Sequence, residues 1–167
     1  MKKIAVYPGS FDPITYGHLD IIRRTLMIFD EVIVAVARNS QKNSLFTTEE
    51  RVVLIQQVLY EEKRVTVDTF TGLLIDYVSS RKAHVIIRGL RAISDFEYEF
   101  QIAQMNSSIG QDIETLFMMT SVQYGYLSSS IVKEVCSLNG NVDVFVPPEV
   151  KAALRLKYGL DRQRTDG

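Results

Sequence analysis

Residues 7–20, with the sequence YPGSFDPITYGHLD, bring together several groups that can bind a phosphate. Gly9 lets the backbone turn and approach a ligand closely, Ser10 offers a hydroxyl, and His18 lies in the first turn of a predicted helix. The free N–H groups and positive dipole end of a helix N-terminus attract an anion, to which a histidine there can also donate a hydrogen bond. A structural turn with a surface histidine would use the same residues, so this segment alone leaves both interpretations open.

Asp12 is the carboxylate nearest to these groups. An aspartate between Phe11 and Pro13 is typical of a side chain that accepts hydrogen bonds from N–H groups of its own turn. The chain also has no cluster of Asp, Glu and His at metal-ligand spacing. We therefore predict a structural role for Asp12 and no metal site made of side chains.

Two further segments supply cations. Lys42 lies in the polar segment RNSQKNSLF, where it can reach a phosphate, although a lysine in such a loop is more often simply solvated. Arg88 and Arg91 flank a glycine at the end of an apolar run. A strand-end arginine beside the core needs an anion, which is either a carboxylate partner or a ligand phosphate. We favour the ligand over a structural ion pair.

Three consecutive serines, at 128–130, begin another predicted helix. One of them is expected to serve as the N-cap. The run also makes a second helix start that can hold a phosphate. Tyr124 and Tyr126 can line a purine pocket beside it, although each on its own is more typical of ordinary packing.

Near-continuous apolar runs predict strands at 3–7, 32–37, 64–69, 84–88 and 115–119. Helical patterns lie between and after them, at 17–29, 47–60, 72–81, 94–109 and 128–139, with a last helix from about 148. Thr47 and Glu50 have the spacing of a capping box. Strands that alternate with helices predict an α/β fold, a single-domain Rossmann-like open parallel sheet of about five strands with helices on both faces. Ligands of such sheets bind beyond the carboxyl ends of the strands, where the segments above lie.

The composition fits one folded domain over residues 1–160 with a polar tail at 161–167. A net charge of −1 argues against a nucleic-acid partner attracted by bulk charge. The single cysteine, Cys136, precludes an intrachain disulfide and fits a reducing compartment. No apolar run is long enough for a membrane span, and the N-terminus does not resemble a signal peptide. We expect a cytoplasmic protein.

The segment PGSFDPITYGH resembles the signature turn S/T-x-F-D-x-x-H/T-x-G-H of the nucleotidyltransferase superfamily related to class I aminoacyl-tRNA synthetases. IRGLRAISDFEYEFQIAQMN and SSSIVKEV are similar to segments of the bacterial phosphopantetheine adenylyltransferases, and KNSLFTTEER, FTGLLIDY and VPPEV follow the expected order. The resemblance covers residues 3 to about 156. Thr15, where cytidylyltransferases carry histidine, also fits this branch.

The resemblance implies that the adenylyl group of ATP is transferred to 4′-phosphopantetheine, giving 3′-dephospho-CoA and pyrophosphate in the penultimate step of coenzyme A synthesis. The attack on the α-phosphate is in line, without a covalent enzyme intermediate. A phosphomonoester is largely ionised near neutral pH because its second pKa is about 6, so a strong general base is dispensable. Positioning and charge stabilisation then carry the catalysis.

The resemblance also implies roles for individual residues. His18 would stabilise the transition state. The residues that would bind phosphopantetheine are Ser10, Lys42, Leu74 and Arg88. Those that would bind ATP are Ser10, Phe11, His18, Gly89, Leu90, Arg91, Glu99, Tyr124, Gly125, Tyr126, Leu127, Ser128, Ser129 and Ser130. Ser44 stands where the family has a proline, which would loosen the loop that carries Lys42.

Mg²⁺ is implied as the counter-ion of ATP, coordinated mainly by phosphates. The family further implies a homohexamer in the cytoplasm and feedback inhibition by CoA, with no nucleic-acid or membrane partner. Two alternatives remain. An adenylyltransferase for nicotinamide mononucleotide, or a cytidylyltransferase, is disfavoured by Thr15, by the RGLR segment and by the short chain. A non-catalytic nucleotide sensor on the same fold is disfavoured because His18, Lys42, Arg88 and Arg91 all occur together.

Overall fold

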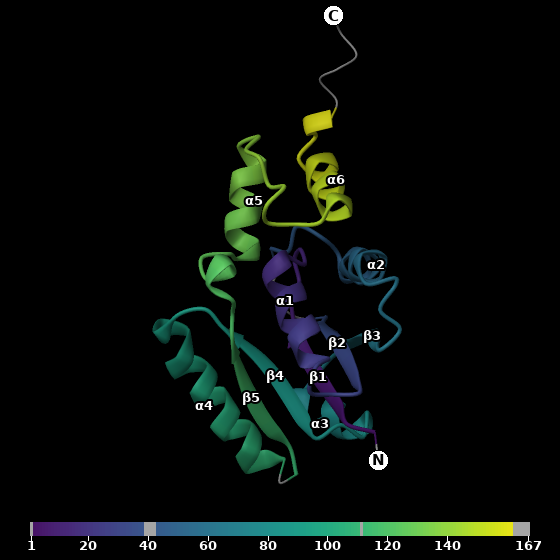
Figure 1. Cartoon of the computed structure of the whole chain (residues 1–167), viewed down its shortest axis with the longest axis vertical. Helices are drawn as coiled ribbons and strands as arrows, with labels where there is room; N and C mark the ends of the chain where they lie inside the picture. Colours follow the sequence, from purple (N-terminus) through teal and green to yellow (C-terminus); the bar gives the residue numbers. More distant parts are fainter. Residues whose placement is uncertain (1, 39–42, 111, 162–167) are drawn as a thin grey trace, which may run out of the picture.

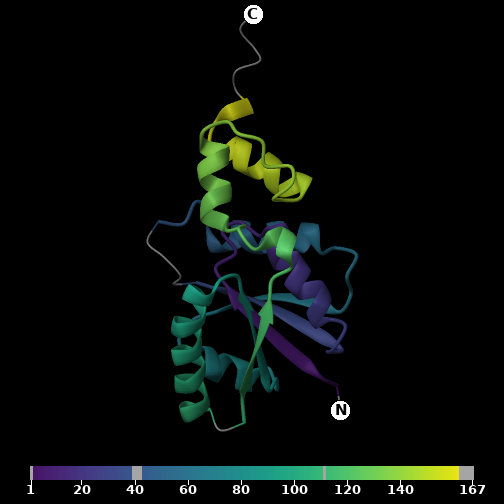
Figure 2. The same cartoon turned by 60° about the vertical axis from the view of Figure 1, so that its left-hand side comes forward.

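A five-stranded parallel sheet forms the centre of the molecule (Figures 1 and 2). The computed structural model describes residues 2–38, 43–110 and 112–161. The strand order is β3-β2-β1-β4-β5, so the chain moves outward from β1 in one direction and then crosses back to β4 on its other side. The switch in direction lies between β1 and β4, which is where open α/β sheets bind ligands. The predicted fold class is confirmed.

The element bounds follow the predicted pattern closely. The strands are β1 (Ile4–Gly9), β2 (Glu31–Ala37), β3 (Val65–Phe70), β4 (Val85–Leu90) and β5 (Glu114–Met119). The helices are α1 (Tyr16–Thr25), α2 (Thr48–Val58), α3 (Leu74–Ser80), α4 (Ile93–Ile109), α5 (Ser129–Ser137) and α6 (Pro148–Lys157), with a 3₁₀ turn η1 (Val122–Tyr124). The predicted strand ends lie within two residues of these bounds.

The one large difference concerns α1, which ends at Thr25 although the apolar pattern predicted helix as far as Phe29. The backbone tightens here, because the N–H groups of Met27 and Ile28 donate to carbonyls three residues earlier, at 3.2 and 3.0 Å. The tighter turn leaves Met27 exposed and folds Phe29 into the core. The prediction failed because the hydrophobic residues continue past the helix.

Helices cover both faces of the sheet, as predicted. Side chains from α1, α2, α5 and α6 pack in one cluster with alternate residues of β1 and β2, among them Tyr7 and Val34. The opposite cluster contains Val6 and Ile33 with side chains of α3. Strands covered on both faces must be apolar on both, which explains the near-continuous runs in the sequence. Figures 1 and 2 show α5 and α6 beyond the carboxyl ends of the strands.

Three helix starts carry side-chain caps that matter for the loops beside them. Thr47 and Glu50 form the predicted capping box at α2. Thr15 caps α1, and Ser128 caps α5 by accepting a hydrogen bond from the N–H of Ile131 at 3.2 Å. These caps fix where the loops end and the helices begin. Across the described ranges, no helix has the length and apolar character needed to cross a membrane.

Candidate active site

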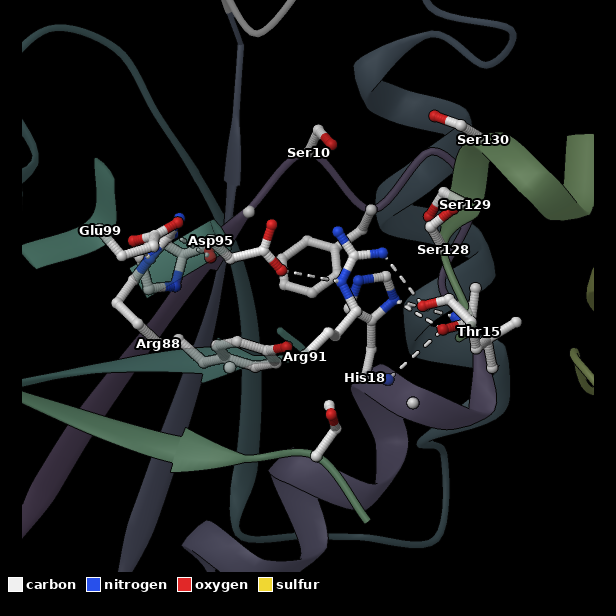
Figure 3. A pocket seen from close by; sticks show the side chains of 18 of the residues that line it. Ser10, Thr15, His18, Arg88, Arg91, Asp95, Glu99, Ser128, Ser129 and Ser130 are labelled. Atoms are coloured by element: carbon white, nitrogen blue, oxygen red, sulfur yellow. Dashed lines mark hydrogen bonds and ion pairs between the residues drawn. The ribbon is translucent and has the colours of Figure 1, made fainter. Parts of the chain in front are cut away.

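A cavity of about 430 Å³ opens at the carboxyl ends of β1 and β4, beside the start of α5 (Figure 3). Its lining includes predicted site residues from four separate segments of the chain. These are Ser10, Phe11, His18, Arg88, Gly89, Arg91, Glu99, Leu127, Ser128, Ser129 and Ser130. The structure therefore brings together, in one cavity, candidate phosphate-binding groups that the sequence places after different strands.

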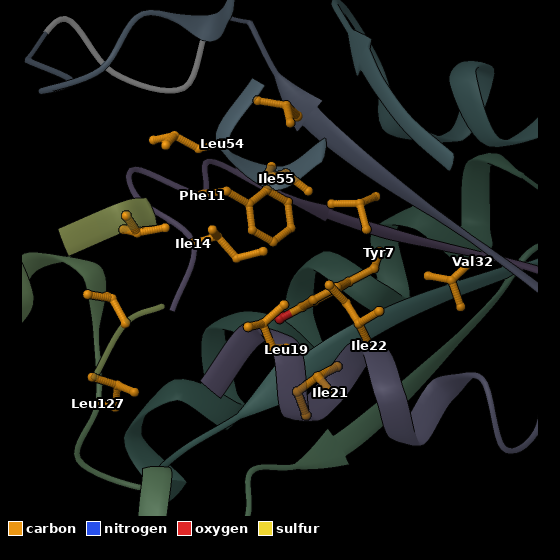
Figure 4. Close-up of a cluster of buried hydrophobic side chains, with 14 of the residues drawn as sticks. Tyr7, Phe11, Ile14, Leu19, Ile21, Ile22, Val32, Leu54, Ile55 and Leu127 are labelled. Carbon is orange, nitrogen blue, oxygen red and sulfur yellow. The ribbon is translucent and has the colours of Figure 1, made fainter. Parts of the chain in front are cut away.

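The turn after β1 is shaped by the ring of Phe11, which is 2% exposed. A Cβ atom on Gly9 would lie 3.0 Å from this ring, so a glycine is needed there. The Phe11 ring packs edge-on against Tyr7, with centroids 5.4 Å apart, and against His18, with centroids 5.0 Å apart. Figure 4 shows Phe11 and Tyr7 within the hydrophobic cluster beneath the site. The apolar core thus extends directly under the histidine.

His18 and Thr15 form a reciprocal cap at the start of α1. The backbone N–H of Thr15 donates to His18 Nδ1 at 3.0 Å, and the His18 N–H donates to Thr15 Oγ1 at 3.4 Å. Because Nδ1 accepts a hydrogen bond, the proton of the neutral imidazole is on Nε2. Burial, together with the nearby Arg91 cation, lowers the pKa of His18 to about 4. His18 is therefore a neutral Nε2–H donor at physiological pH.

Arg88 has a carboxylate partner at the cavity wall. Its Nε donates to Glu99 Oε2 at 2.7 Å, a terminal nitrogen donates to Glu99 Oε1, and the other terminal nitrogen donates to the Pro8 carbonyl at 3.2 Å. The sequence favoured a ligand phosphate over a carboxylate as the anion beside this arginine, but the structure places the Glu99 carboxylate there. The Arg88 side chain is still 31% exposed, so a ligand in the cavity can reach it.

Arg91 links the end of β4 to the segment before α5. One terminal nitrogen donates to the Leu127 carbonyl at 3.1 Å, and Nε lies 3.7 Å from Asp95 Oδ2 (Figure 3). Both arginines at the site are thus balanced by carboxylates of α4.

The three serines at α5 have different partners. Ser128 is the N-cap, as one serine was predicted to be. Ser129 Oγ donates to the Pro13 carbonyl at 2.7 Å, which fastens the helix start to the turn after β1. The capacity of this helix start to bind phosphate therefore rests on its free backbone N–H groups and on Ser130.

The prediction that Asp12 accepts hydrogen bonds within its own turn is wrong, although its structural role is confirmed. Its carboxylate accepts from the N–H groups of Leu45 and Phe46, each at 2.9 Å, and pairs with Lys133 Nζ at 2.8 Å. Burial alone would raise the pKa of Asp12, but Lys133 and the two N–H donors lower it below its usual value. The carboxylate thus satisfies two N–H groups of the segment before α2 and a cation of α5, which would otherwise be left without a partner.

Arg51 in α2 is a second positioning residue, which no sequence pattern indicated. It is 2% exposed, and one terminal nitrogen donates to the Ser10 carbonyl at 2.7 Å. An arginine in a helix that starts with several charged residues is normally interpreted as solvated. The contact holds the backbone of Ser10 in place at the cavity.

Leu74 lies in a second, smaller cavity of about 140 Å³ that adjoins the first. Arg88, Tyr98 and Glu99 line both cavities. The smaller one continues along α3, α4 and β5, and its other lining residues are Ile102, Ala103, Asn106 and Thr115. The site thus has two compartments that meet at the Arg88–Glu99 pair.

Some predicted residues lie elsewhere. Leu90, Tyr124, Gly125 and Tyr126 do not line either cavity. The Tyr124 ring packs against the core, and Tyr126 is 60% exposed with its ring against Phe145. Lys42 lies outside the described residues, so its predicted role stays a prediction.

The cavities also contain residues that the sequence reasoning did not single out, namely Tyr7, Asp95, Tyr98 and Thr120. A signal existed for two of them. Asp95 and Tyr98 share a helix face with Glu99 and Ile102, because residues three and four apart on a helix are neighbours. Tyr7 offered no such signal, since it belongs to an apolar strand.

Comparison with known proteins identifies the family. The model of the cytidylyltransferase-like family matches residues 6–135. A phosphopantetheine adenylyltransferase from Geobacter sulfurreducens is 77% identical over 161 residues, which cover 96% of this chain and 98% of that protein. One from Syntrophotalea carbinolica is 62% identical over 157 residues, covering 94% of this chain and 95% of that protein.

The fold also matches solved structures that are distant in sequence. A putative nicotinate-nucleotide adenylyltransferase from Vibrio parahaemolyticus superimposes with a TM-score of 0.71 at 19% identity, over 98% of this chain and 97% of that one. So low an identity supports the fold alone. The family model covers most of the chain, and the Geobacter and Syntrophotalea relatives are 62–77% identical to it over nearly their full length. The chain therefore belongs to the phosphopantetheine adenylyltransferases of the cytidylyltransferase-like family.

Proposed function

We propose that the two adjoining cavities bind the two substrates of an adenylyl transfer. ATP occupies the larger cavity, and the arm of 4′-phosphopantetheine occupies the smaller one beside Leu74. The observation that supports this assignment is the shared wall of Arg88, Tyr98 and Glu99. A phosphate held at Arg88 has ATP on one side and the pantetheine arm on the other, as in-line attack on the α-phosphate requires.

The transfer yields 3′-dephospho-CoA and pyrophosphate. The attacking phosphate oxygen forms a bond to the α-phosphorus of ATP while the bond to the bridging oxygen of pyrophosphate breaks. The reaction needs no enzyme nucleophile, and Cys136 is buried in the core away from the cavity. The chain therefore acts by positioning the two phosphates and by stabilising charge.

His18 donates a hydrogen bond from Nε2 to an oxygen of the α-phosphate. Its ring is held by the hydrogen bond from Thr15 and by packing against Phe11, so the donor is already oriented. A fixed donor aimed at an oxygen that gains charge in the transition state lowers the barrier without reorganisation.

Arg88 binds the attacking phosphate together with Ser10 and Lys42. Glu99 holds the Arg88 guanidinium in position and lies at the junction where it can also accept from ATP. Arg91, Phe11, Gly89 and the start of α5 hold the nucleotide. The supporting observation is that Arg88 and Arg91 are both fixed by carboxylates of one helix, α4. Leu90 and residues 124–127 contribute to ATP binding as the resemblance implies.

Mg²⁺ accompanies ATP and neutralises part of the phosphate charge. In the described part of the chain, no group of three or more His, Cys, Asp or Glu residues forms a metal site. The nearby carboxylates of Asp12, Asp95 and Glu99 are paired with Lys133, Arg91 and Arg88. These residues fit an ion coordinated mainly by the phosphates.

The resemblance supports four further parts of the proposal. The chain forms one nucleotidyltransferase domain over residues 1–160, followed by a polar tail. It assembles as a homohexamer, acts in the cytoplasm and is inhibited by CoA, the end product of the pathway.

The purified chain should release pyrophosphate when ATP, Mg²⁺ and 4′-phosphopantetheine are all present. A coupled pyrophosphate assay measures this turnover. In control reactions nicotinamide mononucleotide replaces 4′-phosphopantetheine, and CTP replaces ATP. Turnover of ATP with nicotinamide mononucleotide but not with 4′-phosphopantetheine would indicate an adenylyltransferase for nicotinamide mononucleotide instead. Binding of ATP without any turnover would indicate a nucleotide sensor.

Replacing His18 by alanine should lower kcat by roughly 10²–10³-fold, as for loss of one fixed transition-state donor. The dissociation constant of ATP, measured by isothermal titration, should change much less. A kcat close to that of the wild type would show that His18 does not stabilise the transition state.

His18 should remain neutral between pH 5 and 8, with its proton on Nε2, because its pKa is lowered to about 4. Two-bond ¹H–¹⁵N NMR spectra recorded over this range report both the charge and the tautomer. The His18→Ala spectrum distinguishes its signals from those of His84. In the unfolded chain the pKa of His18 has its usual value of 6.5, so the unfolded chain takes up a proton at a higher pH than the folded chain does. The free energy of unfolding therefore decreases as the pH falls from 6.5 to 4. A titration with a midpoint near 6.5 would contradict the buried, neutral state.

Replacing Arg88 by alanine should raise the KM for 4′-phosphopantetheine by roughly 10- to 100-fold, since the change removes a charge-assisted phosphate contact. The KM for ATP should rise less. A double variant, Arg88→Ala with Glu99→Ala, controls for the carboxylate that the single change leaves unpaired. If neither variant alters KM or kcat, Arg88 is a structural residue only.

A further inference from the structure

Tyr7 is a buried residue of β1 that lines the larger cavity. Its side chain is 6% exposed and lies on the face of the sheet covered by α1 (Figure 4). The ring packs against Phe11, and its centroid is 6.4 Å from that of His18. The body of the side chain therefore belongs to the core, while one part of it reaches the site.

The part that reaches the site is the hydroxyl. Within the described residues, no group forms a hydrogen bond with the Tyr7 hydroxyl. Every polar side-chain atom of those residues that is sealed from solvent has a partner. The Tyr7 hydroxyl is therefore not sealed, and the surface open to it is that of the cavity Tyr7 lines. A tyrosine that is otherwise buried and whose hydroxyl has no protein partner is unusual, because a phenylalanine would fill the same space without a polar group to satisfy.

The surroundings of the hydroxyl suit an anion. A Cβ atom added to Gly89 would lie 3.7 Å from Tyr7 Oη, so the hydroxyl lies beside the backbone of Gly89. Gly89, Arg88 and Arg91 line the same cavity as Tyr7. The neighbouring charges are Arg88 and Arg91, which favour the ionised phenol, and Asp20 and Glu99, which disfavour it. Burial is the largest effect and raises the pKa of Tyr7 far above 10. The hydroxyl thus stays protonated and is available as a donor.

We propose that the Tyr7 hydroxyl donates a hydrogen bond to a phosphate oxygen of the bound substrates, next to the oxygen bound by His18. Tyr7 is then a second neutral donor of the active site, placed by the strand as His18 is placed by the helix. The proposal rests on the proposed function, because it requires phosphates in the larger cavity. The packing of the ring against Phe11 holds the hydroxyl beside Gly89 at the cavity.

The test is Tyr7→Phe, which removes only the hydroxyl and keeps the ring packing. The variant should lose roughly 10- to 100-fold in kcat/KM, as expected for one hydrogen bond to a charged acceptor. Its Tm should stay close to that of the wild type. Rates are measured with saturating Mg²⁺ at a temperature well below the Tm of each variant, so that a change in stability cannot imitate a change in activity.

A matched control is Tyr77→Phe. The Tyr77 hydroxyl donates to Asp68 at 2.9 Å, outside both cavities, so this variant should keep its kcat/KM. A Tyr7→Phe enzyme with kcat/KM within twofold of the wild type would overturn the proposal. So would an equal loss in both tyrosine variants. Failure of the proposed function is distinguishable, since the wild-type chain itself would then show no turnover with ATP and 4′-phosphopantetheine.

Discussion

The hydrogen bond from the Thr15 N–H to His18 Nδ1 is the contact on which the site depends most. It satisfies a backbone donor ahead of α1 that has no partner within the helix. It also fixes which nitrogen of the imidazole carries the proton and where that nitrogen points. This one contact therefore caps the start of α1 and makes Nε2 of His18 the hydrogen-bond donor. Glutamate is the usual residue at position N3 of a capping box, three residues after the N-cap, where this chain has His18. A glutamate there would satisfy the backbone but would place a negative charge toward the proposed phosphate site.

The turn that carries this contact is held from outside by residues distant in the sequence. Asp12 connects it to the segment before α2 and, through Lys133, to α5. Arg51 holds the Ser10 carbonyl, and Ser129 donates to the Pro13 carbonyl. Since each of these groups is wholly or partly buried, breaking one contact would leave an unpaired polar or charged group. The turn is thus fixed in one conformation, which is what catalysis by positioning requires.

Sequence patterns predicted the parts of this structure that local physics determines. Strand and helix positions follow from hydrophobic periodicity, and the α2 cap follows from Thr47 and Glu50. The rule for open sheets selected the segments after β1, β4 and β5, which line the larger cavity. The pairing of Arg88 with Glu99 and the true partners of Asp12 could not be predicted in the same way. They depend on which distant segments the fold brings within hydrogen-bond distance, and several acidic and basic residues were equally plausible partners. Tyr7 escaped notice because an aromatic residue in an apolar strand is normally packing.

The charges at the site are balanced in a way that matches its chemistry. Arg88 and Arg91 are each paired with a carboxylate of α4, and the histidine is neutral. A cavity built from unpaired cations would hold phosphates tightly in every state, which lowers KM without lowering the barrier. If substrate phosphates bind at these arginines as proposed, each phosphate competes with a carboxylate for the guanidinium, so the net gain from binding is moderated. The neutral donors from His18 and, as inferred, Tyr7 lose no charge partner when the substrate binds. In the proposed mechanism their hydrogen bonds strengthen as charge accumulates on the phosphate oxygens, and this difference between ground state and transition state would accelerate the transfer.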